Sequence, residues 1–398
     1  MFEHLRITLD EWRRLGEHTG RACISLYMPM IRAGRETRQN ATRFKNCLGE
    51  VERGMIGRGI QRAEIESTLA ALAQAADTEE FWRHRGEGLV VFMEGANVGR
   101  WAITPLRLPQ TIVVSRRFQL TPLLPLVLGD GLFYVVIASQ NEVELLECTR
   151  DGFVEMHLDQ IPHGREVIDR YVEESRQLQA QSVPGAAPSR GRQAVMFHGQ
   201  GGPDRNDKAR IFEYFRAVDE VLGDLIGRER AAAVFAGVDY LFPIYRQANR
   251  SLHLVDEFVR GNFDQVRADL ADIHAQAWKI VQPHFTRNHG EELGLLREAI
   301  AKKQGSTDIG EIVEAGRAGL IEHLAVNPSV QQWGIVDEET GRISEHGQNA
   351  ELEEDLINLA TILAVRSNAI VTTLGDDEFE LGGRAIAAAF RTSVSSLR

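Results

Sequence analysis

The sequence predicts a mixed α/β protein of three domains, and three observations support this prediction. The chain has 398 residues, which is too long for one ordinary hydrophobic core. Residues 131–158 contain three apolar runs separated by Gln-Asn and Asp-Gly turns, a pattern typical of an antiparallel meander. Strand-like and helix-like segments then alternate, which favours a ribonuclease-H-like α/β layer built on that meander.

The first domain is predicted at residues 1–120. Apolar residues repeat there with helical spacing in one segment and form short continuous runs in others. Its predicted elements are a buried strand at 23–30, a helix with Phe44, Leu48, Val51 and Met55 on one face, and a hairpin of 88–93 with 100–106. A proline-rich joint, LTPLLPL (120–126), follows.

The middle domain is predicted at residues 121–283 and begins with the meander. The stretch SVPGAAPSRGRQ (182–193) has little to bury and is predicted to be a loop. The other predicted elements are a polar helix at 165–181, a strand at 194–197, a helix with Ile211, Phe215, Val218, Leu222 and Leu225 in one seam, a strand within 231–245, and a helix with Val266, Leu270, Ile273, Ala277 and Ile280 on one face.

From about residue 284 the pattern changes, and residues 284–398 predict a separate small α/β sandwich. Turn residues at 337–341 divide it. Its predicted elements are helices at 291–303 and 308–317, a strand at 320–326, a helix marked by Leu352, Leu356, Leu359 and Leu363, and strands at 369–374 and 386–391.

Composition narrows the possible functions. The net charge is −12, so nucleic-acid contacts would have to come from local basic patches, and DNA is not an expected partner. The three cysteines, Cys23, Cys47 and Cys148, form no CxxC pair and predict reduced thiols. No signal peptide and no membrane-length apolar run is present, so we expect a cytoplasmic protein. The sequence shows no metal motif and no cofactor motif.

The segment FHGQGGPDRNDK (197–208) is the most informative motif. Three glycines and one glutamine lie between an apolar run and an amphipathic helix. The segment lacks the Gly-Lys-Ser/Thr of a Walker loop, and Asp204 stands where a dinucleotide fingerprint needs its third glycine. Glycines allow close backbone approach to a partner, and a helix start favours anions. A simple turn before a helix would also explain the glycines.

The flanks of this loop are basic. Five basic side chains stand against two acidic ones between residues 190 and 210. A flexible basic loop in an acidic protein is suited to entering a negatively charged place. The candidate loop residues are His198, Gly199, Gly201 and Gly202 with Arg190, Arg192, Arg205 and Lys208, and Gln200 is the candidate functional amide.

The chain resembles the bacterial archaeo-eukaryotic release-factor-like family, which is related to archaeo-eukaryotic class-I release factors and to Pelota. The resemblance rests on the following stretches: SLYMPMIRAGRETRQNATRFKN (25–46), RRFQLTPLLPLV (116–127), FYVVIASQNEVELLE (133–147), FHGQGGPDRNDK (197–208) and AGVDYLFPIYRQAN (236–249). It implies a ribonuclease-H-like middle domain whose loop reaches the peptidyl-transferase centre, and a Pelota-like C-terminal domain.

The loop departs from the Gly-Gly-Gln of class-I release factors. Here the order is Gly199-Gln200-Gly201-Gly202, and residues 1–120 contain no Asn-Ile-Lys-Ser stop-codon motif. The resemblance therefore implies a ribosome-associated translation factor for hibernation, rescue or stalling. The loop at 182–205 would lie near the tRNA acceptor end or the peptidyl-transferase centre. The implied partners are rRNA and tRNA of the ribosome, with a translational GTPase as a further candidate.

Two enzymatic alternatives stay open. The first is a peptidyl-tRNA hydrolase of the release-factor type, with Gln200 as the catalytic residue. The second is a metal-dependent nuclease or hydrolase on the middle domain, which needs clustered carboxylates. The carboxylates Asp130, Asp239 and Glu220 are scattered in the sequence. An interaction scaffold without RNA contact is the third alternative.

A second basic stretch lies at residues 32–62, where eight basic side chains face three acidic ones. Arg38 and Lys45 fall on a different helix face from Phe44 and Val51. The helix is therefore a candidate for phosphate contacts along rRNA, although a solvated helix face would give the same pattern. The candidate RNA-binding residues are Arg35, Arg38, Arg43 and Lys45.

One further segment, AGVDYLFPIYRQAN, invites two interpretations. Its aromatic residues Tyr240, Phe242 and Tyr245 are predicted to belong to the core and to the exit from a strand into a loop, rather than to a platform for stacked bases. Asp239 is predicted at the end of a strand, where it would be a catalytic group, a helix N-cap or a buried hydrogen-bond partner.

Overall fold

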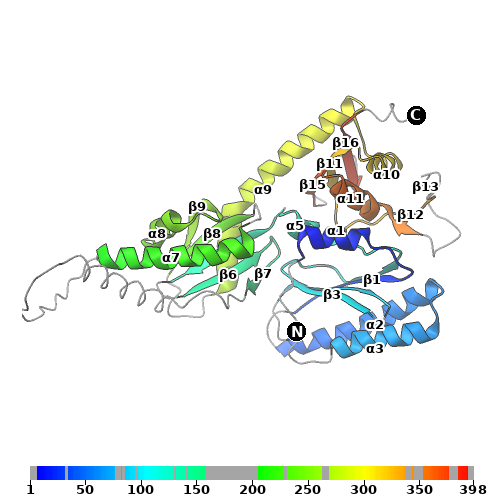
Figure 1. Cartoon of the computed structure of the whole chain (residues 1–398), viewed down its shortest axis with the longest axis horizontal. Coiled ribbons are helices and arrows are strands. Elements are labelled where there is room, and N and C mark those ends of the chain that lie inside the picture. Colours follow the sequence, from blue (N-terminus) through cyan, green and yellow to red (C-terminus); the bar gives the residue numbers. More distant parts are fainter. Residues whose placement is uncertain are drawn as a thin grey trace, which may run out of the picture. The chain divides into compact units, whose positions relative to one another are not determined.

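The computed structural model describes residues 7–31, 35–76, 82, 86–95, 97–129, 131–139, 142–156, 205–227, 231–261, 269–337, 343–344, 353–375 and 384–392. The chain divides into two compact units (Figure 1). Unit 1 comprises residues 1–132, 147–154 and 281–398, and unit 2 comprises residues 133–146 and 155–280. The predicted mixed α/β class is confirmed, while the three predicted domain boundaries stay a prediction.

The N-terminal part of unit 1 is built on a four-stranded sheet with the order β3-β2-β1-β4. The central strand β1 pairs antiparallel with both β2 and β4. The strands are β1 (Cys23–Pro29), β2 (Gly88–Glu94), β3 (Asn97–Thr104) and β4 (Thr111–Ser115). The predicted strand at 23–30 and the predicted hairpin are confirmed, because β2 and β3 pair antiparallel.

Strand β1 is buried on both faces, so its side chains enter two different cores. Ile24, Leu26 and Met28 pack in the core that α2 and α3 cover. Cys23 and Tyr27 point to the opposite face, where they join the core of α1. Figure 1 shows α2 and α3 on one side of this sheet and α1 on the other. The helical elements are α1 (Leu9–Glu17), the 3-10 turn η1 (Arg35–Arg38), α2 (Gln39–Gly57) and α3 (Arg62–Ala75).

The C-terminal part of unit 1 has a second four-stranded sheet with the order β10-β16-β11-β15. The helices α10 (Ile309–Arg317) and α11 (Leu356–Arg366) contact this sheet. Every residue of α11 from Leu356 to Val365 is buried. The strands are β10 (Gly305–Ser306), β11 (Ile321–Val326), β15 (Ile370–Thr373) and β16 (Ile386–Phe390), and a small sheet contains β12 (Trp333–Val336), β13 (Ile343–Ser344) and β14 (Glu354–Asp355).

A buried polar joint links these two parts of unit 1. Residues Phe118–Thr121 lie against the start of α11, close to the short helices η2 (Thr121–Leu123) and α5 (Leu124–Val127). The Asn358 side chain accepts hydrogen bonds from the backbone N–H groups of Leu120 (2.8 Å) and Thr121 (3.2 Å) and from the Thr121 hydroxyl. Its amide donates to the Phe118 carbonyl at 2.9 Å. One side chain thus holds a turn that lies far away in the sequence.

The third main sheet has five strands in the order β7-β6-β5-β8-β9. Strand β8 runs parallel to both β5 and β9. The three meander strands come first in the chain and two parallel strands extend the sheet, which is the order predicted for a ribonuclease-H-like layer. The strands are β5 (Phe133–Ala138), β6 (Val143–Cys148), β7 (Phe153–Met156), β8 (Ala232–Gly237) and β9 (His253–Arg260).

Unit 2 has an aromatic core. Phe235 on β8 lies 5.1 Å from Tyr245 and 5.7 Å from Phe242, both on α8 (Leu241–Ala248), between ring centroids. Phe215 joins them from α7 (Arg205–Ile226). The predicted seam of α7 is confirmed from Ile211 to Leu222.

The last position of that seam is a correction. Leu225 is 43% exposed, whereas Ile226 is buried. A spacing of four from Leu222 keeps the side chain on the buried stripe, and a spacing of three turns it away from the core.

The helix α9 (Leu270–Ala301) is continuous across the position where the sequence pattern changes. Pro283 lies inside it, and proline lacks the N–H that an interior helical residue donates. Ile273 and Ala277 are buried as predicted, and Val281 is buried where Ile280 was expected. None of the helices in the described ranges is long and apolar enough to cross a membrane. The predicted helix at 165–181, loop at 182–193 and strand at 194–197 lie outside the described residues.

Candidate functional site

The loop that the sequence singles out lies mostly outside the described residues. This holds for Arg190, Arg192 and the whole segment His198–Gly202, including Gln200. The described chain resumes at Arg205, the first residue of α7, and Lys208 on the same helix is exposed. The structure therefore places the end of the loop but not its functional side chains.

Helix α7 fixes that end of the loop firmly. Ile211, Tyr214 and Phe215 are buried within the first three turns of the helix. The Phe215 ring stands edge-on to Tyr245 at 5.3 Å between centroids and edge-on to Phe235 at 6.4 Å. Large buried rings therefore hold the third turn of α7, and the helix that follows the loop is fixed in the core of unit 2.

Helix α2 divides into a buried face and a charged face, as predicted. Phe44 and Val51 are almost fully buried, while Arg38 and Lys45 are exposed. Arg43 is half-buried. The side chain of Arg35 lies outside the part of the chain that the structure describes.

The cations of this stretch differ in what they contact. Arg58 donates to the backbone carbonyls of Arg21 and Val114, and Arg62 pairs with Glu66 at 2.9 Å. Arg38, Arg43 and Lys45 form no side-chain hydrogen bond or ion pair with a described residue. These three cations are therefore available to phosphate groups, whereas Arg58 and Arg62 already have partners within the chain.

The start of α2 is held in place by a buried asparagine. The Asn40 side chain accepts from the backbone N–H of Ile31 at 2.9 Å and donates to its carbonyl at 3.0 Å. This two-bond clamp fixes the last residue before the gap at 32–34 to the first turn of the helix. The cations of α2 are thus carried on a fixed element rather than on a free end.

The segment after β8 is mainly structural. Phe242 and Tyr245 are core residues as predicted, and Tyr240 is 37% exposed in the connection between β8 and α8. Tyr240 is exposed because it stands at the helix N-cap position, before the face of α8 that packs inward. Asp239 does not cap α8 and instead pairs with the exposed Arg260 at 3.3 Å.

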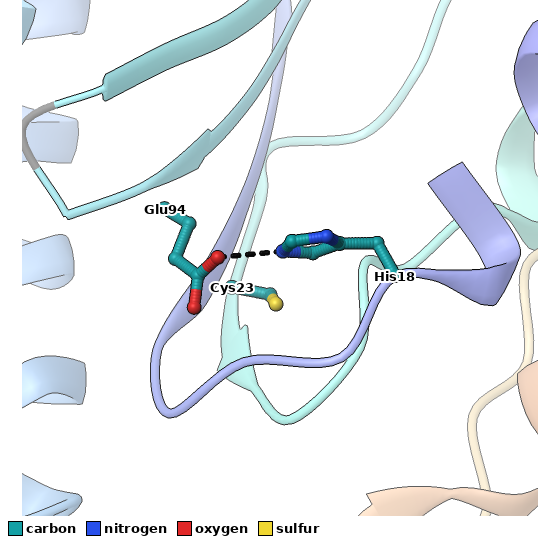
Figure 2. Close-up of side chains that lie close together, drawn as sticks. All are labelled: His18, Cys23 and Glu94. Atoms are coloured by element: carbon teal, nitrogen blue, oxygen red, sulfur yellow. Dashed lines mark hydrogen bonds and ion pairs between the residues drawn. The ribbon is translucent and has the colours of Figure 1, made fainter. Parts of the chain in front are cut away.

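One cluster of metal-ligating atoms was missed from the sequence. His18, Cys23 and Glu94 place an imidazole nitrogen, a sulfur and a carboxylate oxygen within 4.8 Å of one another (Figure 2). They come from three elements and are separated by four and by seventy intervening residues, so no motif spacing announces them. Among the described residues, no other group of three such side chains lies this close together. Asp239 and Glu220 do not belong to the cluster.

The thiol of this cluster is chemically quiet in the protein alone. Burial, together with the negative charge of Glu94, raises the pKa of Cys23 to about 12. At neutral pH the side chain is therefore a thiol, and it donates to the Arg116 carbonyl at 3.4 Å. All three cysteines are buried and unpaired, as predicted for reduced thiols.

The comparison with protein families gives one match, which covers the middle of the chain. Residues 133–283 match the model described as Bacterial archaeo-eukaryotic release factor family 7. The resemblance inferred from the sequence is thereby confirmed, and this segment is release-factor-like. The matched segment includes the loop with Gln200. No curated protein matches the chain.

Several solved structures are similar to the chain at low identity. An archaeal translation termination factor, aRF1, is 15% identical, with a TM-score of 0.24 over 98% of this chain and 100% of that chain. Archaeoglobus fulgidus Pelota is 12% identical, with a TM-score of 0.27 over 97% of this chain and 93% of that chain. Archaeal Pelota, in a model of its ribosome-bound state with ABCE1, is 12% identical, with a TM-score of 0.37 over 77% and 78%.

Proposed function

We propose that this protein is a ribosome-associated translation factor that acts in hibernation, rescue or stalling. The observation that carries the proposal is the family match over residues 133–283, because this segment contains the glycine-rich loop. In the proposed complex the loop at 182–205 lies near the tRNA acceptor end or the peptidyl-transferase centre. Arg190, Arg192, Arg205 and Lys208 bind phosphates there, and Gly199, Gly201 and Gly202 let the backbone approach closely.

The rigid base of the loop supports this role. Buried aromatic residues anchor α7 in its third turn, so the helix that follows the loop is a folded support. His198 and Gln200 then belong to the part that contacts the acceptor end. Placement at a defined distance from the body is what a reaching loop needs.

The charged face of α2 is proposed as a second contact with rRNA. Arg38, the N-cap residue of α2, and Lys45 within the helix are both exposed. Arg35 and Arg43 extend the same basic stretch. Cations in this arrangement bind a phosphate backbone without reading its sequence.

A translational GTPase is the proposed delivery partner. One solved structure that is similar in fold is Saccharomyces cerevisiae Dom34, whose description says that it interacts with Hbs1. It is 9% identical, with a TM-score of 0.32 over 67% of this chain and 64% of that chain. The partnership in this chain is a proposal to be tested by binding.

The first experiment is co-sedimentation of the purified protein with ribosomes from stationary-phase cell extract. We expect the protein in the ribosome pellet at low salt and in the supernatant at high salt, because phosphate contacts release counterions. Protein that stays in the supernatant at every salt concentration would contradict ribosome association.

The contribution of α2 is tested by charge reversal. Arg38→Glu combined with Lys45→Glu should weaken ribosome binding and lower its salt slope by about two. The matched control is Lys279→Glu combined with Arg287→Glu, which reverses two exposed cations on α9. Equal affinities for the two double variants would mean that the charged face of α2 is only a solvated surface.

The chemistry of the loop is tested by peptide release from a ribosome loaded with peptidyl-tRNA and an empty A site. We expect no release by the wild-type protein, and lower ribosome affinity for Gly201→Val or Gly202→Val. Release by the wild type that disappears in Gln200→Ala would instead establish the peptidyl-tRNA hydrolase alternative.

A further inference from the structure

Three side chains of unit 1 converge at one end of its N-terminal sheet. His18 is the C-cap residue of α1, Cys23 is the first residue of β1, and Glu94 is the last residue of β2. Cys23 and Glu94 are direct partners in the antiparallel register of β1 and β2. Directly opposite residues project to the same face of a sheet, so this pairing brings the thiol and the carboxylate together.

The short loop between α1 and β1 brings the imidazole back over this end of the sheet. Figure 2 shows the His18 ring pointing toward the Glu94 carboxylate, with the Cys23 sulfur beside both. The His18 Nε2 atom is 2.6 Å from Glu94 Oε2. The ring also stacks on Phe118, with 5.4 Å between centroids, which limits its rotation.

Gly20 leaves room for the carboxylate. A Cβ atom at this position would lie 1.8 Å from Glu94 Oε1, so any other residue would push the carboxylate away. The Gly20 N–H donates to the Arg116 carbonyl at 2.9 Å, and the Cys23 thiol points to the same carbonyl. The loop is therefore fixed in the position that assembles the three groups.

The donor set matches one class of ligand. Imidazole nitrogen, thiolate sulfur and carboxylate oxygen are the three groups that bind Zn²⁺ in proteins. A thiolate and a carboxylate together neutralise the two positive charges of the ion. This neutrality favours binding of the ion near Arg58 and Arg117, because the charges of both arginines act on Cys23. The side chains of His18 and Glu94 are 42% and 38% exposed, so solvent reaches the cluster from their side.

We propose that His18, Cys23 and Glu94 bind one Zn²⁺ ion, with water as the fourth ligand. Binding replaces the His18–Glu94 hydrogen bond and displaces the proton of the Cys23 thiol. The ion then ties the end of α1 to β1 and β2 within unit 1. This site is independent of the proposed ribosome contacts.

Unit 1 contains a natural control for this proposal. His323 Nδ1 lies 2.9 Å from Glu292 Oε2, and this pair is less exposed than His18 and Glu94. No cysteine joins it within the described residues. A histidine–glutamate pair thus also occurs here without a cysteine, and in the proposal the cysteine distinguishes the metal site from such a pair.

The test uses the full-length protein without a histidine tag. Titration with Co²⁺, a spectroscopic substitute for Zn²⁺, should produce a thiolate-to-metal charge-transfer band in the near ultraviolet, and Zn²⁺ should abolish it at one equivalent. Cys23→Ser should remove the band, while Cys47→Ser, which changes another buried thiol, should keep it. Absence of the band in the wild-type protein would overturn the proposal without any variant.

Affinity measured by competition with a chromophoric chelator completes the test. Glu94→Gln and Gly20→Ala should each weaken Zn²⁺ binding by at least about 10–100-fold. His323→Ala should leave it unchanged. Gly20→Ala displaces only the flexible end of Glu94, so circular dichroism should show a folded protein. Equal Zn²⁺ affinity in the wild type, Cys23→Ser and Gly20→Ala would contradict the site.

Discussion

The interiors of the two units are stabilised in different ways, and the difference bears on how each tolerates change. The core of unit 2 is a cluster of aromatic rings around Phe235, in which apolar contacts dominate. In the polar joint of unit 1, the side chains of Asn358 and Asp355 accept hydrogen bonds from backbone N–H groups, and the Gln119 amide donates to the Asp355 carboxylate. Apolar packing stabilises by area and volume, whereas a buried polar network is stable only when every donor and acceptor is paired.

The largest expected effect is in the aromatic core. Phe235→Ala should lower the free energy of unfolding of unit 2 by about 3–5 kcal/mol, since it removes a fully buried ring and leaves a cavity. Phe258→Ala is the control, because Phe258 contacts Phe235 and Phe242 but is only partly buried. Calorimetry would measure both. A smaller loss for Phe235→Ala than for Phe258→Ala would contradict the central place of Phe235.

In the polar joint, Asn358→Ala should cost about 2–3 kcal/mol, less than the loss of the ring. The substitution leaves the N–H groups of Leu120 and Thr121 buried without their acceptor. Thr121→Val removes only the hydroxyl donor and should cost about 1 kcal/mol. Chemical denaturation of the two variants would measure the difference. If they are equally stable, the joint is not organised by Asn358.

The joint also predicts a pH dependence that the aromatic core lacks. Burial raises the pKa of Asp355 from 3.8 to about 6, although three backbone N–H groups and the Gln119 amide oppose the shift. The folded state then holds the proton more tightly than the unfolded state. The free energy of unfolding should therefore fall as the pH rises from about 4 to about 6, by on the order of 2 kcal/mol, and stay level above that range.

Asp355→Asn isolates this contribution. Its amide oxygen can still accept from the backbone N–H groups of Gln332 and Ile357, and a flipped Gln119 amide can present its oxygen to the new NH₂ group. Stability curves of the wild type and the variant, recorded between roughly pH 3.5 and pH 8, should separate as the pH rises from about 4 to about 6 and then run parallel. Only the wild type should lose stability in the lower range. Curves that are parallel over the whole pH range would exclude Asp355 as the titrating group.

The smallest expected effect lies at the surface of unit 1. Thr8 caps α1 by accepting from the Glu11 N–H at 3.3 Å, so Thr8→Ala should cost about 1 kcal/mol. Thr8→Ser keeps the hydroxyl and should restore most of the loss. Thermal unfolding would compare them. A loss as large as that of Asn358→Ala would mean that the cap supports the joint as well as the helix.

This comparison also shows what could be predicted from the sequence. The aromatic core follows from local periodicity, since Phe215 and Leu222 repeat along one stripe of α7 and β8 is a short apolar run. The error at Leu225 arose because a helix surface allows spacings of three and four, and only the partner surface decides between them. Periodicity therefore predicts elements well and their last buried residue less well.

The polar joint could not be predicted in the same way. Asn358 and its partner Thr121 are 237 positions apart, and an asparagine in an apolar helix gives no indication of which backbone it binds. The cluster of His18, Cys23 and Glu94 was missed for the same reason, because strand register rather than sequence spacing brings its members together. The glycine-rich loop shows the opposite case, since its composition is informative while its side-chain positions lie outside the described residues.

The discontinuity of unit 1 has a consequence for its own synthesis. The apolar face of the N-terminal sheet that includes Tyr27 and Phe92 shares its core with Leu356 and Ile357 of α11. A nascent chain therefore completes this face only after nearly the whole polypeptide has been translated, although the opposite face can pack against α2 and α3 early. During elongation the half-covered sheet exposes aromatic surface of the kind that chaperones bind. Truncation before α11 should accordingly yield an aggregating fragment rather than a folded N-terminal domain.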